Sequence, residues 1–401
     1  MPIFSRGVAK TIAIAPELVA YGTAGAGPGQ YLRRISSDLN LSVQQLDSQE
    51  ILPSQQMRDS RQGPRQVQGS LSGQLSPGSY AALFQGLLRG TFTAAGASGV
   101  VSDCSGTLDG NGNLVLSSGT AGWQTSGIKF GDIVRVAAGT NAGINFRVVN
   151  FPSASQISLL AIGGVPQAFG VAASFQLVGV GKKLIIPQGP LQVDRSFSLE
   201  HWYSDVGQSE LYTGIKPSQI ALNIPASGFV TAQFSFTGQN AVTGNTQTYP
   251  GATGVSTGTS LTATSGRVIY QGTTLAYLTG ANLQLMTQAQ APNTVGSNVA
   301  PFLFVSELMA RGSFTSLYTA DTLTNDFLNE NEVSLSFTMT SSPSGTADFV
   351  SIFLPRVKLT SSTKTDSQSA ITRSYNFVGL EYLGGLSSVD YTTVVVQDSL
   401  A

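Results

Sequence analysis

A regular alternation of apolar and uncharged polar positions stands out between residues 195 and 238. Ile220, Leu222 and Ile224 alternate with Ala221 and Asn223, and a Pro-Ala-Ser-Gly turn follows at 225–228. Beyond the turn, the apolar positions Val230, Ala232, Phe234 and Phe236 alternate with the polar positions Thr231, Gln233, Ser235 and Thr237. A period of two on both sides of a short turn predicts an antiparallel β-hairpin with one apolar face and one uncharged polar face.

The same period returns on both sides of this hairpin. A strand is predicted over 197–203, and a second hairpin is predicted from 267–271 and 275–277 around a Gly-Thr turn. Further alternating runs lie at 333–339, 349–354, 371–382 and 391–396. Successive alternating strands separated by turn residues are typical of antiparallel sheets. We therefore expect a mainly β fold, an antiparallel β-sandwich or partial barrel.

One segment has the spacing of a helix instead. An apolar stripe with helical period is formed by Tyr80, Leu83, Phe84, Leu87 and Leu88. Pro77 suits the first turn, Ser76 is a candidate cap, and Gly90 follows the last turn. The pattern predicts one α-helix near 77–89 that flanks the sheet. Residues 319–328 are predicted as a short helix or a turn.

Residues 91–180 differ in composition, being rich in Gly, Ala and Ser. Short strand candidates lie at 114–116, 133–136, 146–149, 157–160 and 175–178. Short strands at this spacing predict a small all-β domain. We expect it to be inserted between 1–90 and 181–401, which form the main domain. A run that resembles a calcium loop at 109–113 lacks the required glycine and carboxylate, so it indicates a tight turn.

Two stretches of the main domain carry little pattern. Residues 1–30 read as an N-terminal arm that ends in a glycine-rich run at 22–29, which favours flexibility or close backbone contact. Residues 239–265 form a linker of Thr, Gly, Asn and Ser without a charged side chain. A long loop of this kind is usually functional, or ordered only by a partner.

Charge is scarce along the whole chain. Of 401 residues, 11% are charged, against roughly 25% in ordinary soluble domains. Lys plus Arg number 21 and Asp plus Glu number 22, for a net charge of −1. A near-neutral chain has no basic field for tight nucleic-acid binding, and its surface favours association. No apolar run is long enough to span a bilayer and no signal-peptide pattern is present, so we expect a soluble protein made in the cytoplasm of its producer.

The sequence contains few candidates for catalytic or metal-binding residues. Cys104 is the only cysteine and His201 the only histidine, and they lie in different predicted domains. No GxSxG, HExxH or CxxC motif occurs, and no pair of acidic residues is compelling as a general acid and base. We expect no catalytic, metal or cofactor site. Trp202, Tyr203 and Tyr212 could form a sugar platform, although aromatic residues at strand spacing are more often core.

Three sequence segments, in this order along the chain, resemble those of a known family. They are SQQMRDSRQGPRQVQGSLSGQLSPGSYAALFQGLLRG at 54–90, RSFSLEHWYSDVGQSELYTGIKPSQIALNIPASGFVTAQFSFTGQ at 195–239, and FLPRVKL at 353–359. Together they resemble tail tube proteins, the major tail proteins of long-tailed bacteriophages, over roughly 30–90 and 180–400. Residues 91–180 look like the extra β-domain that some of these proteins carry, and we expect that domain to face outward.

The resemblance implies a structural virion protein and not an enzyme. Such proteins form a β-sandwich with a flanking helix, and typically six copies close into a ring. Hairpins of neighbouring subunits join into a barrel around the lumen, and stacked rings form the tube that conducts DNA into the host. The implied partners are the protein itself, the tail tip or baseplate, the tape measure and the tail terminator proteins, with double-stranded DNA passing without specific binding and no membrane insertion. The implied location is the phage tail, assembled in the host cytoplasm.

The resemblance also gives candidate sites. Residues expected at the lumen or in the ring hairpins are Thr231, Gln233, Ser235, Thr237, Arg267, Ile269 and Gln271. Residues expected at contacts between rings are Gly25, Gly27, Gly29, Thr243, Thr248 and Thr257. Two other classes of function stay open: a receptor- or carbohydrate-binding β-sandwich that uses 91–180, and an enzyme such as a glycosidase on a β scaffold.

Overall fold

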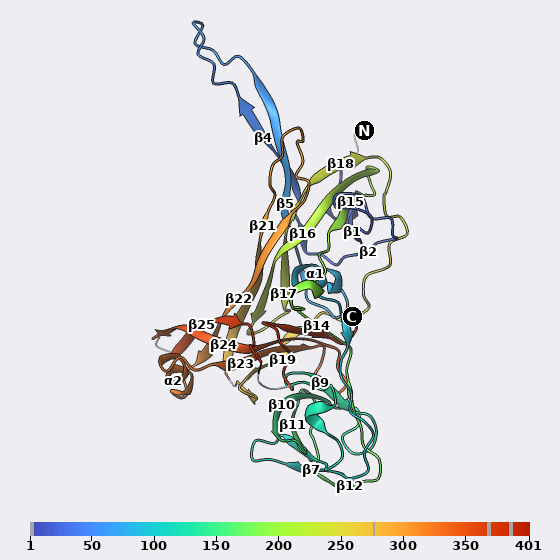
Figure 1. The fold of residues 1–401 in the computed structure, drawn as a ribbon, viewed down its shortest axis with the longest axis vertical. Coiled ribbons are helices and arrows are strands. Elements are labelled where there is room, and N and C mark those ends of the chain that lie inside the picture. The colour runs from blue at the N-terminus through green and yellow to red at the C-terminus, as the bar shows by residue number, and fades with distance from the viewer. Residues whose placement is uncertain (1–3, 276, 367–369, 385–387) are drawn as a thin grey trace.

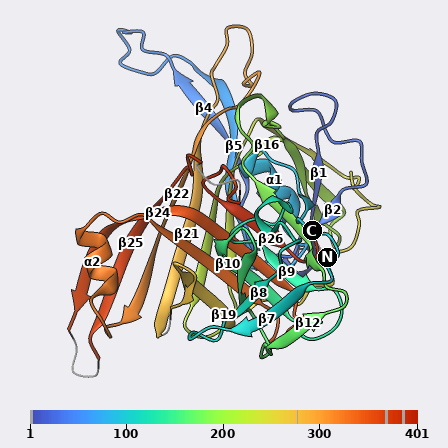
Figure 2. The same cartoon turned by 60° about the horizontal axis from the view of Figure 1, so that its bottom comes forward.

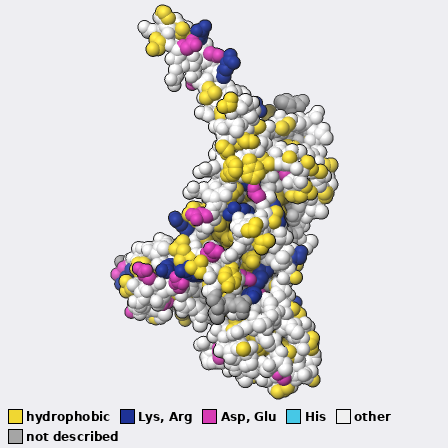
Figure 3. Space-filling view, viewed as in Figure 1, with side chains coloured by type: hydrophobic (Ala, Val, Ile, Leu, Met, Phe, Trp, Pro, Cys, Tyr) yellow, Lys and Arg dark blue, Asp and Glu magenta, His cyan; other side chains and the backbone are white. Residues whose placement is uncertain are grey.

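The computed structural model describes residues 4–275, 277–366, 370–384 and 388–401. The molecule is elongated, with a long hairpin projecting at one end and a small β unit at the other (Figure 1). Nearly all the regular structure is antiparallel strand, so the mainly β expectation is confirmed. The face seen in Figure 3 is mostly neither charged nor apolar, and charged side chains gather at the tip of the projecting hairpin.

The main sheet is continuous and strongly curved, forming a half-barrel (Figure 2). Its strands follow in the order β4 (Asn40–Asp47), β5 (Ser60–Gln74), β17 (Thr231–Gly238), β16 (Gln208–Pro225), β21 (Leu278–Gln290), β22 (Phe304–Leu317), β25 (Thr372–Leu380), β24 (Phe349–Thr365), β23 (Val333–Thr340) and β19 (Thr262–Tyr270). An isolated bridge between Phe229 and Thr262 brings β19 back toward the start of β17. Shorter strands extend this sheet: β3 (Ser36–Ser37), β6 (Thr93–Ala94), β14 (Lys182–Ile185), β20 (Thr273–Thr274) and β26 (Val395–Asp398).

Strand β16 belongs to two layers. Its second half lies in the main sheet, and its first half pairs with β15 (Phe197–Tyr203) and β18 (Asn240–Gly244). β15 in turn pairs with β1 (Lys10–Pro16), and β1 with β2 (Gln30–Tyr31). Gly214, at φ +65°, lies at the junction, where a β-carbon would come within 2.6 Å of the Gln239 side chain. This backbone conformation and close approach require glycine, and they let one strand turn between the layers.

Helix α1 (Ala81–Leu88) packs against the main sheet, as its apolar stripe predicts. The Phe234 ring lies 4.8 Å from the Tyr80 ring and 6.1 Å from the Phe84 ring, measured between centroids. The start of the helix was predicted wrongly: Tyr80 is the N-cap, and the Ser76 hydroxyl bonds to that of Ser79. Helix α2 (Thr322–Leu328) forms at the segment predicted as helix or turn, and it packs beside β24. Short 3₁₀ turns lie at Gly7–Ala9, Trp123–Thr125 and Gly189–Leu191.

Within residues 91–180, here called the inserted segment, the strands from 104 to 179 form a separate seven-stranded sheet. Its strands follow in the order β12 (Phe169–Ala172), β7 (Cys104–Leu108), β8 (Leu114–Ser117), β11 (Gln156–Ala161), β10 (Asn145–Ser153), β9 (Ile133–Val136) and β13 (Leu177–Gly179). The sheet encloses its own apolar cluster around the fully buried Trp123. The chain leaves the main sheet at β6 and returns at β14, and these two strands pair with each other.

Asp398, at the end of β26, makes the stability of the fold depend on pH. Its buried carboxylate accepts the backbone amides of Gly78 and Leu400 at 2.8 and 2.9 Å, and burial raises its pKa to about 6. A carboxyl with a raised pKa stabilises the fold in its protonated form. That contribution, on the order of 3 kcal/mol, is therefore lost as the pH rises from about 4 through about 6. Urea unfolding at pH 4.5 and 7.5 should show this loss, and Asp398→Asn should remove it; an unchanged pH dependence in Asp398→Asn would contradict the assignment.

Candidate functional site

One face of the main sheet carries two rows of mostly uncharged polar side chains that run across the strands. The strand register aligns one row in the order Thr231, Asn223, Asn282, Ser313 and Asn376. It aligns the next row in the order Ser72, Gln233, Ala221, Gln284 and Arg311. All of these residues are exposed or half-buried, and a shallow hollow of about 400 Å³ lies over the centre of the two rows. We call this surface the polar face.

The opposite side of the same strands is the core. Ala232 and Phe234 are buried, whereas Gln233 between them is exposed. The predicted alternation of the first hairpin is therefore confirmed in register as well as in place. Thr231 and Gln233 lie in the two rows of the polar face, and Ser235 and Thr237 lie farther along the same side of β17.

The polar face holds little charge. Arg311 is the one charged residue in its two rows. Side chains with amide and hydroxyl groups can bind water on such a surface, but they cannot neutralise phosphates along it. A polyanion would therefore gain little counterion-release attraction there.

The second predicted hairpin faces a different surface. It is formed by β19 and β20. Ile269 on β19 is only 3% exposed and lies near Arg147 of the inserted segment and Phe353 of β24. The Arg267 guanidinium donates to the Ala161 carbonyl of that segment at 2.8 Å. Gln271 is exposed at the turn, and it precedes Gly272, which lies against Val149. The structure therefore does not bring Arg267, Ile269 and Gln271 together with the residues of the polar face.

The glycine-rich arm and the charge-free linker lie against each other within one chain. Gly25 is buried beside the Pro16 carbonyl, and Gly29 lies beside the Ile14 carbonyl and the Tyr249 ring. The Thr253 amide donates to the Gly29 carbonyl at 3.0 Å. The remaining predicted contact residues are at the surface: Gly27 is half-buried, and Thr243, Thr248 and Thr257 are exposed.

A buried carboxylate, which the sequence reasoning missed, orders that linker. Glu200 on β15 is fully buried and accepts the amides of Thr248 and Tyr249 at 2.6 and 2.9 Å, and the Ser209 hydroxyl at 2.6 Å. Charge-assisted bonds to backbone amides are among the stronger hydrogen bonds in proteins. The linker therefore does not need a partner to be ordered at these residues.

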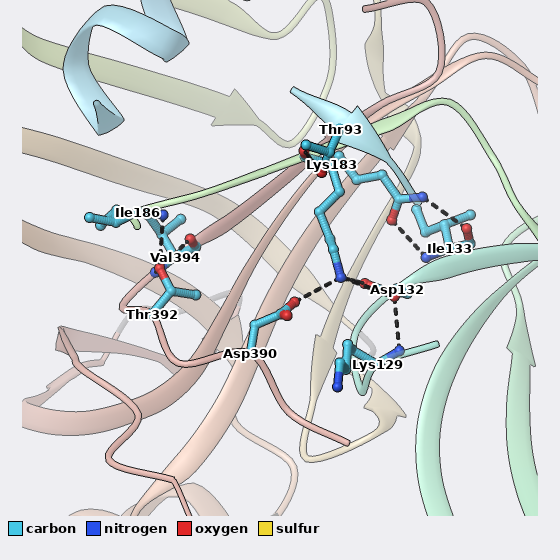
Figure 4. Close-up of polar contacts among 10 residues, drawn as sticks. Thr93, Lys129, Asp132, Ile133, Lys183, Ile186, Asp390, Thr392 and Val394 are labelled. Atoms are coloured by element: carbon cyan, nitrogen blue, oxygen red, sulfur yellow. Dashed lines mark hydrogen bonds and ion pairs between the residues drawn. The ribbon is translucent and has the colours of Figure 1, made fainter. Parts of the chain in front are cut away.

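A second buried cluster fastens the inserted segment to the main sheet (Figure 4). The Lys183 ammonium on β14 lies 3.0 Å from Asp132 Oδ1 and 2.9 Å from Asp390 Oδ2. Burial raises the pKa of Asp132. Burial lowers the pKa of Lys183, but the neighbouring carboxylates of Asp132 and Asp390 outweigh this effect and raise it. The Gln397 side-chain amide adds bonds to both the amide and the carbonyl of Ile133. The cluster therefore joins three segments that are distant in sequence.

Arg147 extends the same junction. Its buried guanidinium donates to the hydroxyls of Thr338 and Ser351 on the main sheet, and it lies 5.6 Å from the centroid of the Phe353 ring. Burial lowers the pKa of Arg147 to about 9. Burying a guanidinium against neutral partners costs free energy, and the two hydroxyls that it binds fix its place between the two sheets.

Cys104 and His201, the two residues with the most reactive side chains, lie in different sheets. Cys104 lies in the core of the inserted segment, where burial raises its thiol pKa to about 12. His201 is buried on β15 beside the Ser37 hydroxyl, and burial lowers its pKa to about 3, so its ring is neutral. Trp202 and Tyr203 on the same strand are half-buried, and Tyr212 is buried. Across the part of the chain that the structure describes, no three His, Cys, Asp or Glu residues are placed to hold a metal ion.

The fold is therefore a mainly β half-barrel whose polar face carries little charge. The family model of the phage tail tube protein matches residues 7–379. The chain therefore belongs to the phage tail tube protein family, and it is a component of a virion tail. No curated protein matches the chain. No described helix is long and apolar enough to cross a membrane. The resemblance seen in the sequence is confirmed, and membership favours a tube role over a surface-binding module.

Proposed function

We propose that six copies of this chain close into a ring, that rings stack into the tail tube, and that the polar face lines the channel through which DNA passes. The observation that carries this proposal is the pair of nearly charge-free rows on the polar face. A wall of amides and hydroxyls keeps the channel wet while adding no row of cations that would hold phosphates. In this role the chain has no catalytic activity.

The rest of the chain has a place in the same proposal. The tube would meet the tail tip or baseplate, the tape measure and the tail terminator, and it would assemble in the host cytoplasm. The inserted segment, which has its own sheet at the end of the half-barrel away from the projecting hairpin (Figure 1), would be a domain that faces outward. The exposed residues Thr243, Thr248 and Thr257 are candidates for contact between rings. Gly25 and Gly29 would act indirectly, by holding the arm against the linker.

Negative-stain electron microscopy of the purified chain tests the assembly step. Rings or tubes are expected. A preparation that contains only monomers or compact trimers would contradict the proposal and return the surface-binding alternative.

Gln233→Lys tests which surface meets the DNA. Gln233 is exposed and touches only the Ser70 hydroxyl weakly, at 3.4 Å, so the substitution should leave folding and tubes intact. Each ring would gain a circle of positive charges, which should slow DNA release from phage particles several-fold at low salt and less at high salt. The measurement is the rate of triggered DNA release at several salt concentrations.

Gln233→Asn is the matched neutral control, and Val171→Lys places the same charge on an exposed site of the inserted segment. Both should release DNA at the normal rate. Loss of tubes in Gln233→Lys, or an unchanged rate at every salt concentration, would show that the polar face does not line the channel.

A further inference from the structure

The run of strands from β4 to β22 ends, among the described residues, in two strand edges without a neighbouring strand. β4 pairs with β5 on one side and leaves its other side open. β22 pairs with β25 only over residues 310–317, so that residues 304–309 are open on the side away from β21. The Arg89 guanidinium reaches the second edge from outside the sheet and donates to the Ser306 carbonyl at 3.2 Å. Open edges of this kind are templates for pairing with another chain.

The two open edges lie at the same level of the sheet. The register aligns Met309, Met286, Gln219, Ser235 and Ser70 in one row. At the β5 end of this row, the Ser70 carbonyl accepts the amide of Asp38, just before β4 begins. From this row β4 runs forward over 40–47, whereas the open part of β22 runs backward from 309 to 304. Four strands (β5, β17, β16 and β21) lie between β4 and β22, and each neighbouring pair is antiparallel. β4 and β22 therefore run in opposite directions.

The apolar core reaches both edges and is incomplete at both. Leu41 on β4 and Leu308 on β22 pack against the main core but stay only partly buried. Phe304, at the start of the open part of β22, is 58% exposed. A groove of about 600 Å³ runs beside the same edge, lined in part by Arg89, Leu308 and Tyr391. A hydrophobic layer that is open at both ends is typical of a surface cut at a subunit boundary.

Backbone groups on β4 are already turned outward. The Arg65 backbone amide donates to the Asn298 carbonyl at 2.8 Å, so this amide points away from β4. Val43 faces Arg65 across the ladder. In an antiparallel pair, residues opposite each other share one orientation, so the Val43 amide and carbonyl also point away from β5. They lie at the open edge, where another strand can meet them.

At the far end of the main sheet, the described residues of β19 are partly covered. Arg267 of β19 donates to the inserted segment, the turn after β19 places Gly272 against Val149, and the next strand, β20, has two residues. A second copy can therefore extend the sheet most directly at β4 and β22.

We propose that the open edge of β4 in one copy pairs antiparallel with residues 304–309 of β22 in the next copy, which continues the main sheet from subunit to subunit. This pairing rests on the proposed ring and identifies its seam. It is a head-to-tail contact, in which each copy uses two different edges, and such contacts close into rings when the rotation between copies closes. It also joins Leu41 of one copy to the core near Leu308 of its neighbour.

Cysteine cross-linking of the full chain tests the seam. Ser42→Cys with Glu307→Cys places one exposed thiol on each edge, and the native Cys104 is fully buried and should not react. A short dimaleimide added to assembled tubes should give a ladder of covalent multimers on a denaturing gel. The control pair Ser42→Cys with Val171→Cys, at an exposed site of the inserted segment, should be labelled without a ladder.

Val43→Pro tests the same edge through the backbone. Proline removes the outward amide but no bond within the chain, and edge strands tolerate it. The variant should keep the melting temperature of the monomer and lose assembly, whereas Val43→Ala, which keeps the amide, should assemble. Tubes without a ladder, or normal assembly of Val43→Pro, would overturn the pairing. Failure of the unsubstituted chain to form rings would instead contradict the proposed function.

Discussion

Replacing Lys183 with methionine should lower the free energy of unfolding by about 3–5 kcal/mol, because it removes one partner of a buried ionic cluster. The side chains of Asp132 and Asp390 are only 1% and 12% exposed, and each lies about 3 Å from the Lys183 ammonium. Without the cation, two buried carboxylates would face each other. Burial already raises the pKa of Asp132, so the loss should be largest at neutral pH and above, and smaller in mild acid where Asp132 can be protonated.

Urea unfolding followed by tryptophan fluorescence is the appropriate measurement, because Trp123 reports on the inserted segment and Trp202 on β15. Lys182→Met is the matched control, since Lys182 is adjacent in sequence but exposed, and it should change stability by less than about 0.5 kcal/mol. The triple variant Lys183→Met, Asp132→Asn, Asp390→Asn should recover much of the loss. Equal effects of Lys183→Met and Lys182→Met would refute the cluster as a stabilising junction.

The sequence predicted what depends on local alternation. The hairpin of β16 and β17 was placed with its faces assigned, because every second residue from Ile220 to Phe236 is apolar and the rest are uncharged. The strands at 114–116, 133–136 and 157–160 were found as short, mostly apolar runs separated by turn residues. Helix α1 was located by its stripe, but its first residue was not, because the turn at 76–79 uses residue types that also cap helices.

The parts that escaped prediction depend on contacts between distant segments. Lys183 meets Asp132 and Asp390 from 51 and 207 residues away, and nothing in their local sequence marks them. Glu200 reads as an ordinary polar strand position, yet its burial orders the linker near Tyr249. Alternation placed Ile269 on one face of a strand, and only the position of the inserted segment shows that this face is covered.

Predicting the polar face requires both the local alternation within each strand and the register between distant strands. The alternation in β16 and β17 identified polar positions one strand at a time. Their alignment into rows required the register across β5, β17, β16, β21, β22 and β25, which pairs residues from four distant parts of the chain. The sequence could therefore suggest the composition of the surface but not its extent.

The second large effect is expected at Phe234. Phe234→Ala should lower the free energy of unfolding by about 3–5 kcal/mol, because it removes a fully buried ring and leaves a cavity. The lost ring packs against Tyr80 and Phe84, so α1 should detach first and become sensitive to proteases before the sheet unfolds. Urea unfolding and limited proteolysis of the monomer measure both effects.

Gln233→Ala, one residue away on the opposite face, is the matched control and should change the stability of the monomer by less than about 0.5 kcal/mol. The contrast separates the two faces of one strand without reference to assembly. If Gln233→Ala were as destabilising as Phe234→Ala, Gln233 would be part of the packing, and the polar face could not be a free surface available to line a channel. A large effect at Phe234 alone leaves that surface open to the substitutions that test its role.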